Sequence, residues 1–326
     1  MDKIELKKKL FNSNTTQKIL AFSSLILLLI IFSIASPNFF TGTNIKGILL
    51  ATAVNGVLAV GVTFVIITGG IDLSIGTVMT FSSVIAGVII SMWGLPIWIG
   101  LLGAILAGSL CGFVNGFNVA KFRIPAFIAT LGMMMITKGL SLVISNAKPI
   151  YFTGAKGIFI DKFSDISTGT IMGIPNAVII LFVVAGIGGI LLNKTLLGRY
   201  TFAIGSNEEA TRLSGINTDK WLIIIHTLTG AFCGVAGILM AARLNSAHPA
   251  LGQGYELDAI AAVVIGGTSL SGGKGTILGT IIGAFIMSVL INGLRILSVP
   301  QEWQTVVTGI IVIAAVVADV ARKNKK

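Results

Sequence analysis

Residues 44–68 read NIKGILLATAVNGVLAVGVTFVIIT, a run with a single charged side chain, Lys46. A transmembrane helix needs about 20 predominantly apolar residues to cross about 30 Å of hydrocarbon. This stretch is long and apolar enough to do so, and similar runs recur from Ile19 to Val320. They predict an all-α polytopic membrane protein with about ten transmembrane helices. The predicted spans are 18–36, 44–68, 72–92, 97–119, 125–145, 175–193, 220–243, 256–270, 276–297 and 302–321.

Composition supports a membrane environment. Of the 326 residues, 54% are hydrophobic and 11% are charged, whereas soluble domains average about 25% charged residues. The mean hydropathy is +0.96. The formal net charge of +11 comes from basic residues that gather at the ends of the spans, as they do in cytoplasmic flanks. This placement indicates a lipid bilayer as the partner and argues against nucleic acid.

The same placement predicts an orientation. An even number of spans puts both termini on one side, and a cytoplasmic N-terminus leaves sixteen of the 23 basic residues inside and six outside, with Lys138 within a span. Because basic residues favour the cytoplasmic side, we expect both termini to be cytoplasmic. The chain then divides into an N-terminal tail (1–17), a transmembrane domain (18–321) and a C-terminal tail (322–326).

The N-terminus also has features of a signal peptide. A basic head precedes the apolar stretch Ile19–Ser36, which contains the small residues Ser33 and Ala35. The apolar core of a signal peptide is usually about 7–15 residues long, and this stretch is longer. We therefore predict a retained first helix.

Two long polar connections fall on opposite faces of the predicted bundle. Residues 146–174 form an extracytoplasmic loop, and residues 193–219 form a cytoplasmic loop in which 205–215 read GSNEEATRLSG. Ser206 and Glu209 have the S-x-x-E spacing of a capping box, and Gly215 suits a helix stop. The pattern predicts a helix of about two turns. Such a helix either rests on its own bundle or docks into a partner protein.

Small residues recur four apart in two of the predicted spans. Such stripes let helices approach closely in lipid, where packing depends on van der Waals contact. We interpret both as packing seams within a compact bundle. The seams are Ala104, Gly108, Gly112 and Gly116 in one span, and Gly275, Gly279 and Gly283 in another.

Two further glycine-rich segments have the character of broken or re-entrant helices. Residues 69–76 read GGIDLSIG, and residues 266–273 read GGTSLSGG. Unwound backbone at membrane depth is tolerated where it is packed in protein or lines a cavity, and transporters often place binding or gating elements there. Each segment is therefore either part of a gate or pathway, or a short cytoplasmic turn. The similar sequences of the two segments suggest an internal repeat.

The sequence contains no phosphate-binding loop. The nearest candidate, 273–275, has glycine after Lys274 instead of Ser or Thr, and Thr268 stands where the first loop glycine belongs. Any ATP is then expected to be hydrolysed by another chain. Cys111 and Cys233 lie in apolar runs, where a thiol behaves as a small hydrophobe. We predict no catalytic site and no metal site.

Few ionisable residues fall inside the spans. Asp72, Lys138, His226 and Asp258 are the candidates that an ion-coupled carrier would need. We expect Asp72, with Ser74, to cap the helix that follows it. Lys138 is expected to extend towards the interface or to pair with an acid. His226 is interpreted as a hydrogen-bonded packing residue rather than a proton relay.

Three segments together resemble the ribose-type permeases of bacterial ABC importers, within the branched-chain amino acid/ribose permease superfamily. They are 69–76, 203–216 and 256–270, and the resemblance covers nearly the whole chain. It implies ten-helix subunits in the bacterial cytoplasmic (inner) membrane, paired as a homodimer or with a related permease. It also implies a partner ATPase subunit that binds ATP and Mg, and an extracytoplasmic sugar-binding protein. No cofactor is implied on this chain.

The resemblance also implies a role for the cytoplasmic loop, which would supply a coupling helix that docks the ATPase. The coupling residues implied are Ser206, Asn207, Glu208, Glu209, Ala210, Leu213 and Gly215. The expected function is translocation of ribose or a related monosaccharide by alternating access. Candidate pathway or gate residues are Asp72, Ser74, Asn115, Thr268 and Ser269. A permease for branched-chain amino acids or nucleosides, and an ion-coupled secondary carrier, are the alternatives.

Overall fold

The structure is a computed structural model that describes residues 14–153 and 162–323. Residues 1–13 of the predicted N-terminal tail, 154–161 of the predicted external loop and 324–326 of the predicted C-terminal tail lie outside the described residues.

Helices account for most of the described chain. In order they are α2 (Asn14–Ala35), α3 (Gly42–Ile67), α4 (Ile75–Gly87) with the π-helical turn η1 (Val88–Met92), α5 (Ile97–Lys121), α6 (Ala126–Ile144), α7 (Asp165–Thr168), α8 (Asn176–Lys194), α9 (Leu196–Ser206), α10 (Glu208–Leu213), α11 (Thr218–Leu244), α12 (Tyr255–Ile265), α13 (Ile277–Ile296) and α14 (Gln301–Lys323). The described residues also form two antiparallel pairs of short strands. Strand β1 (Ile150–Tyr151) pairs with β4 (Ser246–Ala247), and β2 (Thr170–Ile171) pairs with β3 (Ile174–Pro175).

Seven described helices are long and apolar enough to cross a membrane: α3, α4 with η1, α5, α6, α8, α11 and α13. The apolar parts described for α2 and α14 are shorter, covering Ile19–Ala35 and Gln301–Val317. The predicted all-α, multi-pass class is therefore confirmed. The count of ten crossings and the side on which the termini lie stay predictions.

Helix α3 forms the centre of the bundle. Every residue from Thr52 to Ile67 is buried, as expected for a helix that is apolar on all sides. It packs against α11, α13, α8 and α12. The outer helices α5, α6 and α8 instead expose large apolar side chains such as Leu106, Val143 and Ile190, which suits a surface that faces lipid tails.

The predicted glycine seams are confirmed as packing surfaces except at Gly275, which lies in the loop before α13 and faces the side chains of Ile67 and Thr268. A Cβ added at Gly112 on α5 would overlap the His226 carbonyl oxygen on α11. In the other direction, a Cβ added at Gly230 on α11 would overlap the Gly108 carbonyl oxygen on α5. On α13, a Cβ at Gly283 would likewise overlap the Ala262 carbonyl oxygen on α12. At these crossings the helix backbones are in direct contact, so no larger residue fits.

The predicted span 256–270 is wrong in its last third, because α12 ends at Ile265. Gly267 follows with a φ of +93°, a left-handed conformation that ends helices and that glycine adopts without strain. The 11 residues of α12 rise about 16 Å, roughly half the hydrocarbon thickness. Helix α12 is a half-helix, and a loop leads from it to α13.

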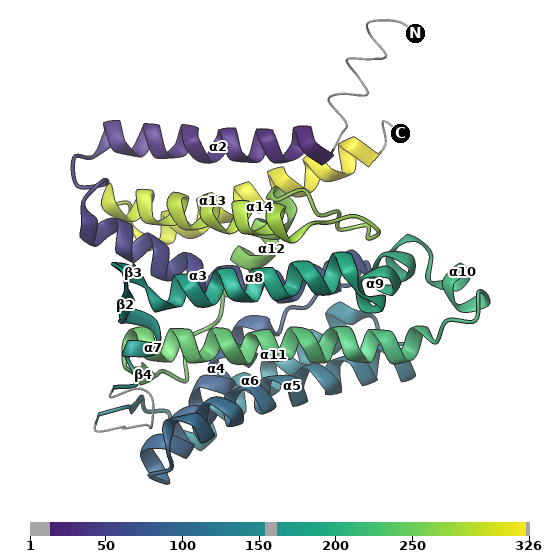
Figure 1. Ribbon diagram of the computed structural model, residues 1–326, viewed down its shortest axis with the longest axis horizontal. Coiled ribbons are helices and arrows are strands. Elements are labelled where there is room, and N and C mark those ends of the chain that lie inside the picture. The colour runs from purple at the N-terminus through teal and green to yellow at the C-terminus, as the bar shows by residue number, and fades with distance from the viewer. Residues whose placement is uncertain (1–13, 154–161, 324–326) are drawn as a thin grey trace, which may run out of the picture.

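The molecule has two distinct ends (Figure 1). At one end lie α9, α10, the start of α2 and the end of α14, and at the other lie α7 and the paired strands. We call these the α10 end and the strand end. The described parts of the predicted loops 146–174 and 193–219 therefore lie at opposite ends of the molecule, and the side of the membrane that each faces stays a prediction. Helix α9 was missed, because only the part of this loop that contains α10 was predicted to be helical.

Candidate functional site

Residues 68–74, between α3 and α4, form the first break. Asp72 is 2% exposed, and its Oδ1 accepts hydrogen bonds from the Ser74 backbone N (2.9 Å) and the Ser74 Oγ (2.6 Å). On α5, Asn115 Nδ2 donates to the same Ser74 Oγ at 3.0 Å. The expected cap of α4 by Asp72 is wrong, because the N-cap is Ser74 and, among the described residues, no side chain accepts a hydrogen bond from the first turn of that helix. Asp72 instead binds the N-cap residue itself, and three of the five candidate pathway residues form one cluster.

Two substitutions at Asp72 distinguish the contribution of its hydrogen bonds to stability from the contribution of its charge. Asp72→Ala removes the acceptor and leaves the Ser74 N–H and O–H buried without it, which costs about 1–3 kcal/mol for each unsatisfied group. Asp72→Asn keeps a carbonyl oxygen in the same place and should cost less. Thermal unfolding of the purified protein in detergent checks this order. Equal losses for the two variants would mean that the charge, not the hydrogen bonds, matters.

Helix α6 also holds the first break in place. The Leu73 backbone N donates to Thr130 Oγ1 at 3.1 Å. About two turns further along the same helix, Thr137 Oγ1 donates to Thr77 Oγ1 on α4 at 2.8 Å. The unwound backbone is thus packed in protein, the condition under which it is tolerated at membrane depth.

Residues 266–276, between α12 and α13, form the second break. Ser269 Oγ and the Leu270 backbone N both donate to Asp319 Oδ2 on α14, at 3.0 and 3.1 Å. Thr268 is fully buried, and its Oγ1 has no hydrogen-bond partner among the described residues. No hydrogen bond within the described chain joins Thr268 or Ser269 to the Asp72 cluster, so the five candidates divide into two groups.

Asp319 was not predicted as a site residue. It lies in the last turns of α14, where a negative charge opposes the helix dipole. An acid in that position needs partners other than its own helix, and this is the signal that could have found it.

The end of α3, which leads into the first break, meets the second break and the end of α9 through direct contacts between backbone atoms. The Gly273 N donates to the Ile67 carbonyl at 2.8 Å. Gly205, in the last turn of α9, lies so close that an added Cβ would overlap the Ile67 oxygen and lie 2.7 Å from the Gly273 N. We call Ile67, Gly205, Gly272 and Gly273 the glycine junction. It links the end of α3 and the second break to the last turn of α9. From there, Ser206 and Asn207 lead directly into α10.

The capping box predicted for α10 is wrong. Ser206 is the last residue of α9, and the N-cap is Asn207, whose Oδ1 accepts a hydrogen bond from the Ala210 N at 2.9 Å. Asn is as good an N-cap as Ser, and α9 continues as far as Ser206, so the cap moves one residue along. The predicted helix stop is confirmed, because Gly215 has a φ of +85° just past the C-cap Ser214.

The cap assignment gives a matched pair of variants. Asn207→Ala should destabilise α10 by about 0.5–2 kcal/mol, because the cap acceptor is lost. Ser206→Ala should be nearly neutral, because its hydroxyl makes no hydrogen bond with a described residue. Hydrogen exchange of the backbone amides from Ala210 to Ser214 measures the difference. Faster exchange in Ser206→Ala than in Asn207→Ala would contradict the assignment.

The two acids of α10 point to different partners. Glu208 turns back to the bundle, where its Oε1 lies 2.9 Å from Arg123 Nη1 and accepts from Thr218 Oγ1 at 3.3 Å. Glu209 pairs with Arg212 on the same helix. Leu213 is 80% exposed. The outer face of α10 is therefore formed by residues such as Glu209 and Leu213, and Glu208 belongs to its inner face.

Two of the three remaining ionisable candidates within the helices have hydrogen-bond partners. His226 is buried with Nδ1 3.0 Å from the Leu222 carbonyl oxygen, which confirms a hydrogen-bonded packing histidine. Lys138 Nζ donates to Gln253 Oε1 at 3.0 Å, so it pairs with an amide and not with an acid. Asp258 is half-buried on α12.

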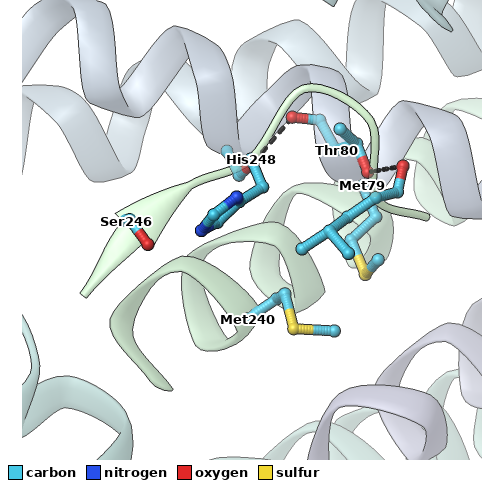
Figure 2. Close-up of a pocket in the computed structure, with 7 residues that line it drawn as sticks. Met79, Thr80, Met240, Ser246 and His248 are labelled. Atoms are coloured by element: carbon cyan, nitrogen blue, oxygen red, sulfur yellow. Dashed lines mark hydrogen bonds between the residues drawn. The ribbon is translucent and has the colours of Figure 1, made fainter. Parts of the chain in front are cut away.

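Two hollows in the described structure do not suit a sugar. Figure 2 shows a recess in which His248 lies over Met240 and beside Ser246, with Thr80 on the facing helix α4. Thr80 Oγ1 donates to the Leu251 carbonyl at 2.8 Å, so the segment between β4 and α12 lies directly on α4 and leaves no room for a ligand. The other is an apolar groove lined by Ile174 and α8 residues, and it lacks the polar groups that orient a ligand.

Comparisons with known proteins give a consistent result. Residues 44–316 match the family model described as branched-chain amino acid transport system / permease component. The chain is 44% identical over 303 residues to the ribose import permease protein RbsC of Escherichia coli (strain K12), covering 93% of this chain and 92% of that protein. It is 42% identical over 314 residues to RbsC of Bacillus subtilis (strain 168), covering 96% of each. It is 38% identical over 300 residues to the L-arabinose transport system permease protein AraH of Escherichia coli (strain K12), covering 92% of this chain and 89% of that protein.

Proposed function

The chain belongs to the family of branched-chain amino acid transport system permease components, and from this premise we propose that it is the permease subunit of an ATP-driven importer of ribose or a related monosaccharide. The observation that carries the substrate class is the identity of 42–44% to ribose import permeases over more than 90% of each chain. The L-arabinose permease is less similar, at 38%. We therefore propose ribose, and not another pentose, as the substrate. We likewise propose a sugar, and not a branched-chain amino acid or a nucleoside.

We place the α10 end in the cytoplasm of a bacterium, with the protein in its inner membrane. The basic residues predicted to lie inside support this choice: those described at this end include Lys121, Arg123, Arg199, Arg212 and Lys220. Basic residues near the ends of spans favour the cytoplasmic side. The strand end, with loop 146–174, then faces outwards and would receive an extracytoplasmic sugar-binding protein.

The partner ATPase is proposed to supply the energy and to hold ATP and Mg. Helix α10 suits a docking element because it lies at the far end of the molecule, next to α9 (Figure 1), with Leu213 exposed on it. A helix of six residues is marginal on its own and gains from contact with a partner. Closure of the ATPase would move α10, and the glycine junction would pass this movement to both breaks.

The sugar path is proposed to run between two subunits, formed by two copies or by this chain and a related permease. Neither of the two cavities described above offers a polar site of sugar size. The buried polar groups of the first break, Asp72, Ser74 and Asn115, would act as a gate beside this path. A transient, weakly binding path suits transport, because tight binding would slow release.

Reconstitution tests the proposal. The chain is incorporated into liposomes with its ATPase, and ribose-loaded binding protein is added on one side. We expect ribose uptake that requires ATP and both partners, and slower uptake of arabinose and xylose. Uptake by this chain alone, without the ATPase, would instead identify a secondary carrier. Uptake of branched-chain amino acids in place of sugars would identify the alternative substrate class.

A further inference from the structure

Four charged side chains join three helices at the α10 end. Arg123 Nη1 lies 2.9 Å from Glu208 Oε1, and Arg123 Nη2 lies 2.8 Å from Asp219 Oδ1. Lys121 Nζ lies 3.0 Å from Asp219 Oδ2. We call these residues the α10 network. It ties the end of α5 and the turn after it to the first turns of α10 and α11.

The backbone of Arg123 indicates that its side chain is needed where it stands. Its φ is +56°, a left-handed conformation that costs most residues about 1–2 kcal/mol and that Gly or Asn adopts more readily. The planar guanidinium can hold two carboxylates at once, which the single ammonium of lysine does less well. At this turn the arginine adopts an unfavourable backbone conformation, and its side chain contacts two helices.

Helix α5 connects the α10 network to the first break. Asn115, which donates to Ser74 Oγ at 3.0 Å, lies six residues before Lys121 on the same helix. Six helical residues span about 9 Å. One rigid helix therefore carries, within two turns, a contact with the Asp72 cluster and an attachment to α10. This route is separate from the glycine junction, which reaches the breaks from α9.

We propose that Arg123 is a positioning residue that locks α10 to α5, so that movement of α10 reaches the first break. This inference rests on the proposed function, because it takes α10 to be the element that the ATPase moves. Each ion pair is partly exposed and contributes little stability by itself. The role of Arg123 comes from its geometry, which fixes α10 and α11 to one turn.

The test uses the assembled importer in proteoliposomes and measures ribose uptake for each ATP hydrolysed. Arg123→Asn keeps a residue that tolerates the left-handed backbone and removes the guanidinium. We expect this variant to copurify with the ATPase and to lose at least about fivefold in uptake per ATP, the lower range of ordinary couplings between sites. Arg123→Lys should be intermediate. Arg199→Ala is the matched control, because Arg199 is exposed on α9 and forms no ion pair with a described residue.

A double-mutant cycle distinguishes a loss of coupling between α10 and the first break from a general loss of protein stability. If Arg123 acts through Glu208, combining Arg123→Asn with Glu208→Gln should give no greater loss than the larger single loss. Additive losses, unchanged uptake per ATP in Arg123→Asn, or loss of the ATPase from the purified complex would each overturn the inference. If the unaltered complex takes up no ribose, the proposed function fails, and this outcome is recognised before any variant is compared.

Discussion

Gly205→Ala is expected to abolish coupled ribose uptake. The added methyl group would overlap the Ile67 carbonyl oxygen and lie 2.7 Å from the Gly273 N. Both contacts are backbone atoms, which cannot rotate away as a side chain can. The end of α9 must therefore shift, and the hydrogen bond from Gly273 N to the Ile67 carbonyl lies directly in its way. Overpacking of this kind costs about 1–3 kcal/mol.

The loss in transport should exceed the loss in stability. A displaced α9 moves α10 away from its place on the bundle, so ATP hydrolysis would no longer reach the breaks. Uptake and ATPase stimulation by loaded binding protein are measured beside thermal unfolding. Gly189→Ala, on the neighbouring helix α8, is the matched control, because an added methyl group there meets no atom within 4 Å. Normal uptake by Gly205→Ala would show that the glycine junction does not carry the coupling.

The sequence predicted the features that depend on local composition and periodicity. Apolar runs of sufficient length identified the long spans, because the bilayer sets that length. The small residues at Gly108 and Gly112 identified the surface of α5 that contacts α11, because only small side chains permit such an approach. Asp72 and Ser74 were placed together correctly, since the interaction spans two residues and needs no knowledge of the tertiary structure.

The features that were missed depend on contacts between distant segments. The pairing of Arg123 with Glu208 and Asp219 joins residues more than 80 positions apart, and no pattern in either segment specifies it. The contact between Ser269 in the second break and Asp319 joins residues 50 positions apart, and no local pattern specifies it either. The cap of α10 was misplaced by one residue because Ser206 and Asn207 are both good caps, and the choice between them depends on where α9 ends.

The half-helix α12 shows a third kind of difficulty. Residues 256–270 are apolar enough on average to be read as one span, yet the helix stops at Ile265. The glycine pair 266–267 was noted as a possible break, but composition alone does not decide whether two glycines end a helix or lie within a packing seam. In this chain both occur, because Gly266 also contacts Gly279 on α13.

Gly230→Ala is expected to force α5 and α11 apart. Two effects oppose each other at this position. Replacing glycine by alanine within a helix favours the helix by up to about 1 kcal/mol. The added Cβ would, however, overlap the Gly108 carbonyl oxygen and lie 3.0 Å from the Gly112 N, and such overpacking costs about 1–3 kcal/mol, occasionally more. Since the obstructing atoms belong to helix backbone, we expect the steric cost to be the larger effect and the variant to be less stable.

The separation would also reach the first break, because α5 carries Asn115. If α5 moves away from α11, the hydrogen bond from Asn115 to Ser74 must stretch or break. Thermal unfolding of the purified protein should show a fall of a few degrees for Gly230→Ala. Gly139→Ala on α6 should show no fall, because its added methyl group meets no atom within 4 Å. A rise in the unfolding temperature of Gly230→Ala would mean that helix propensity outweighs packing, and that the α5–α11 contact is looser than the structure has it.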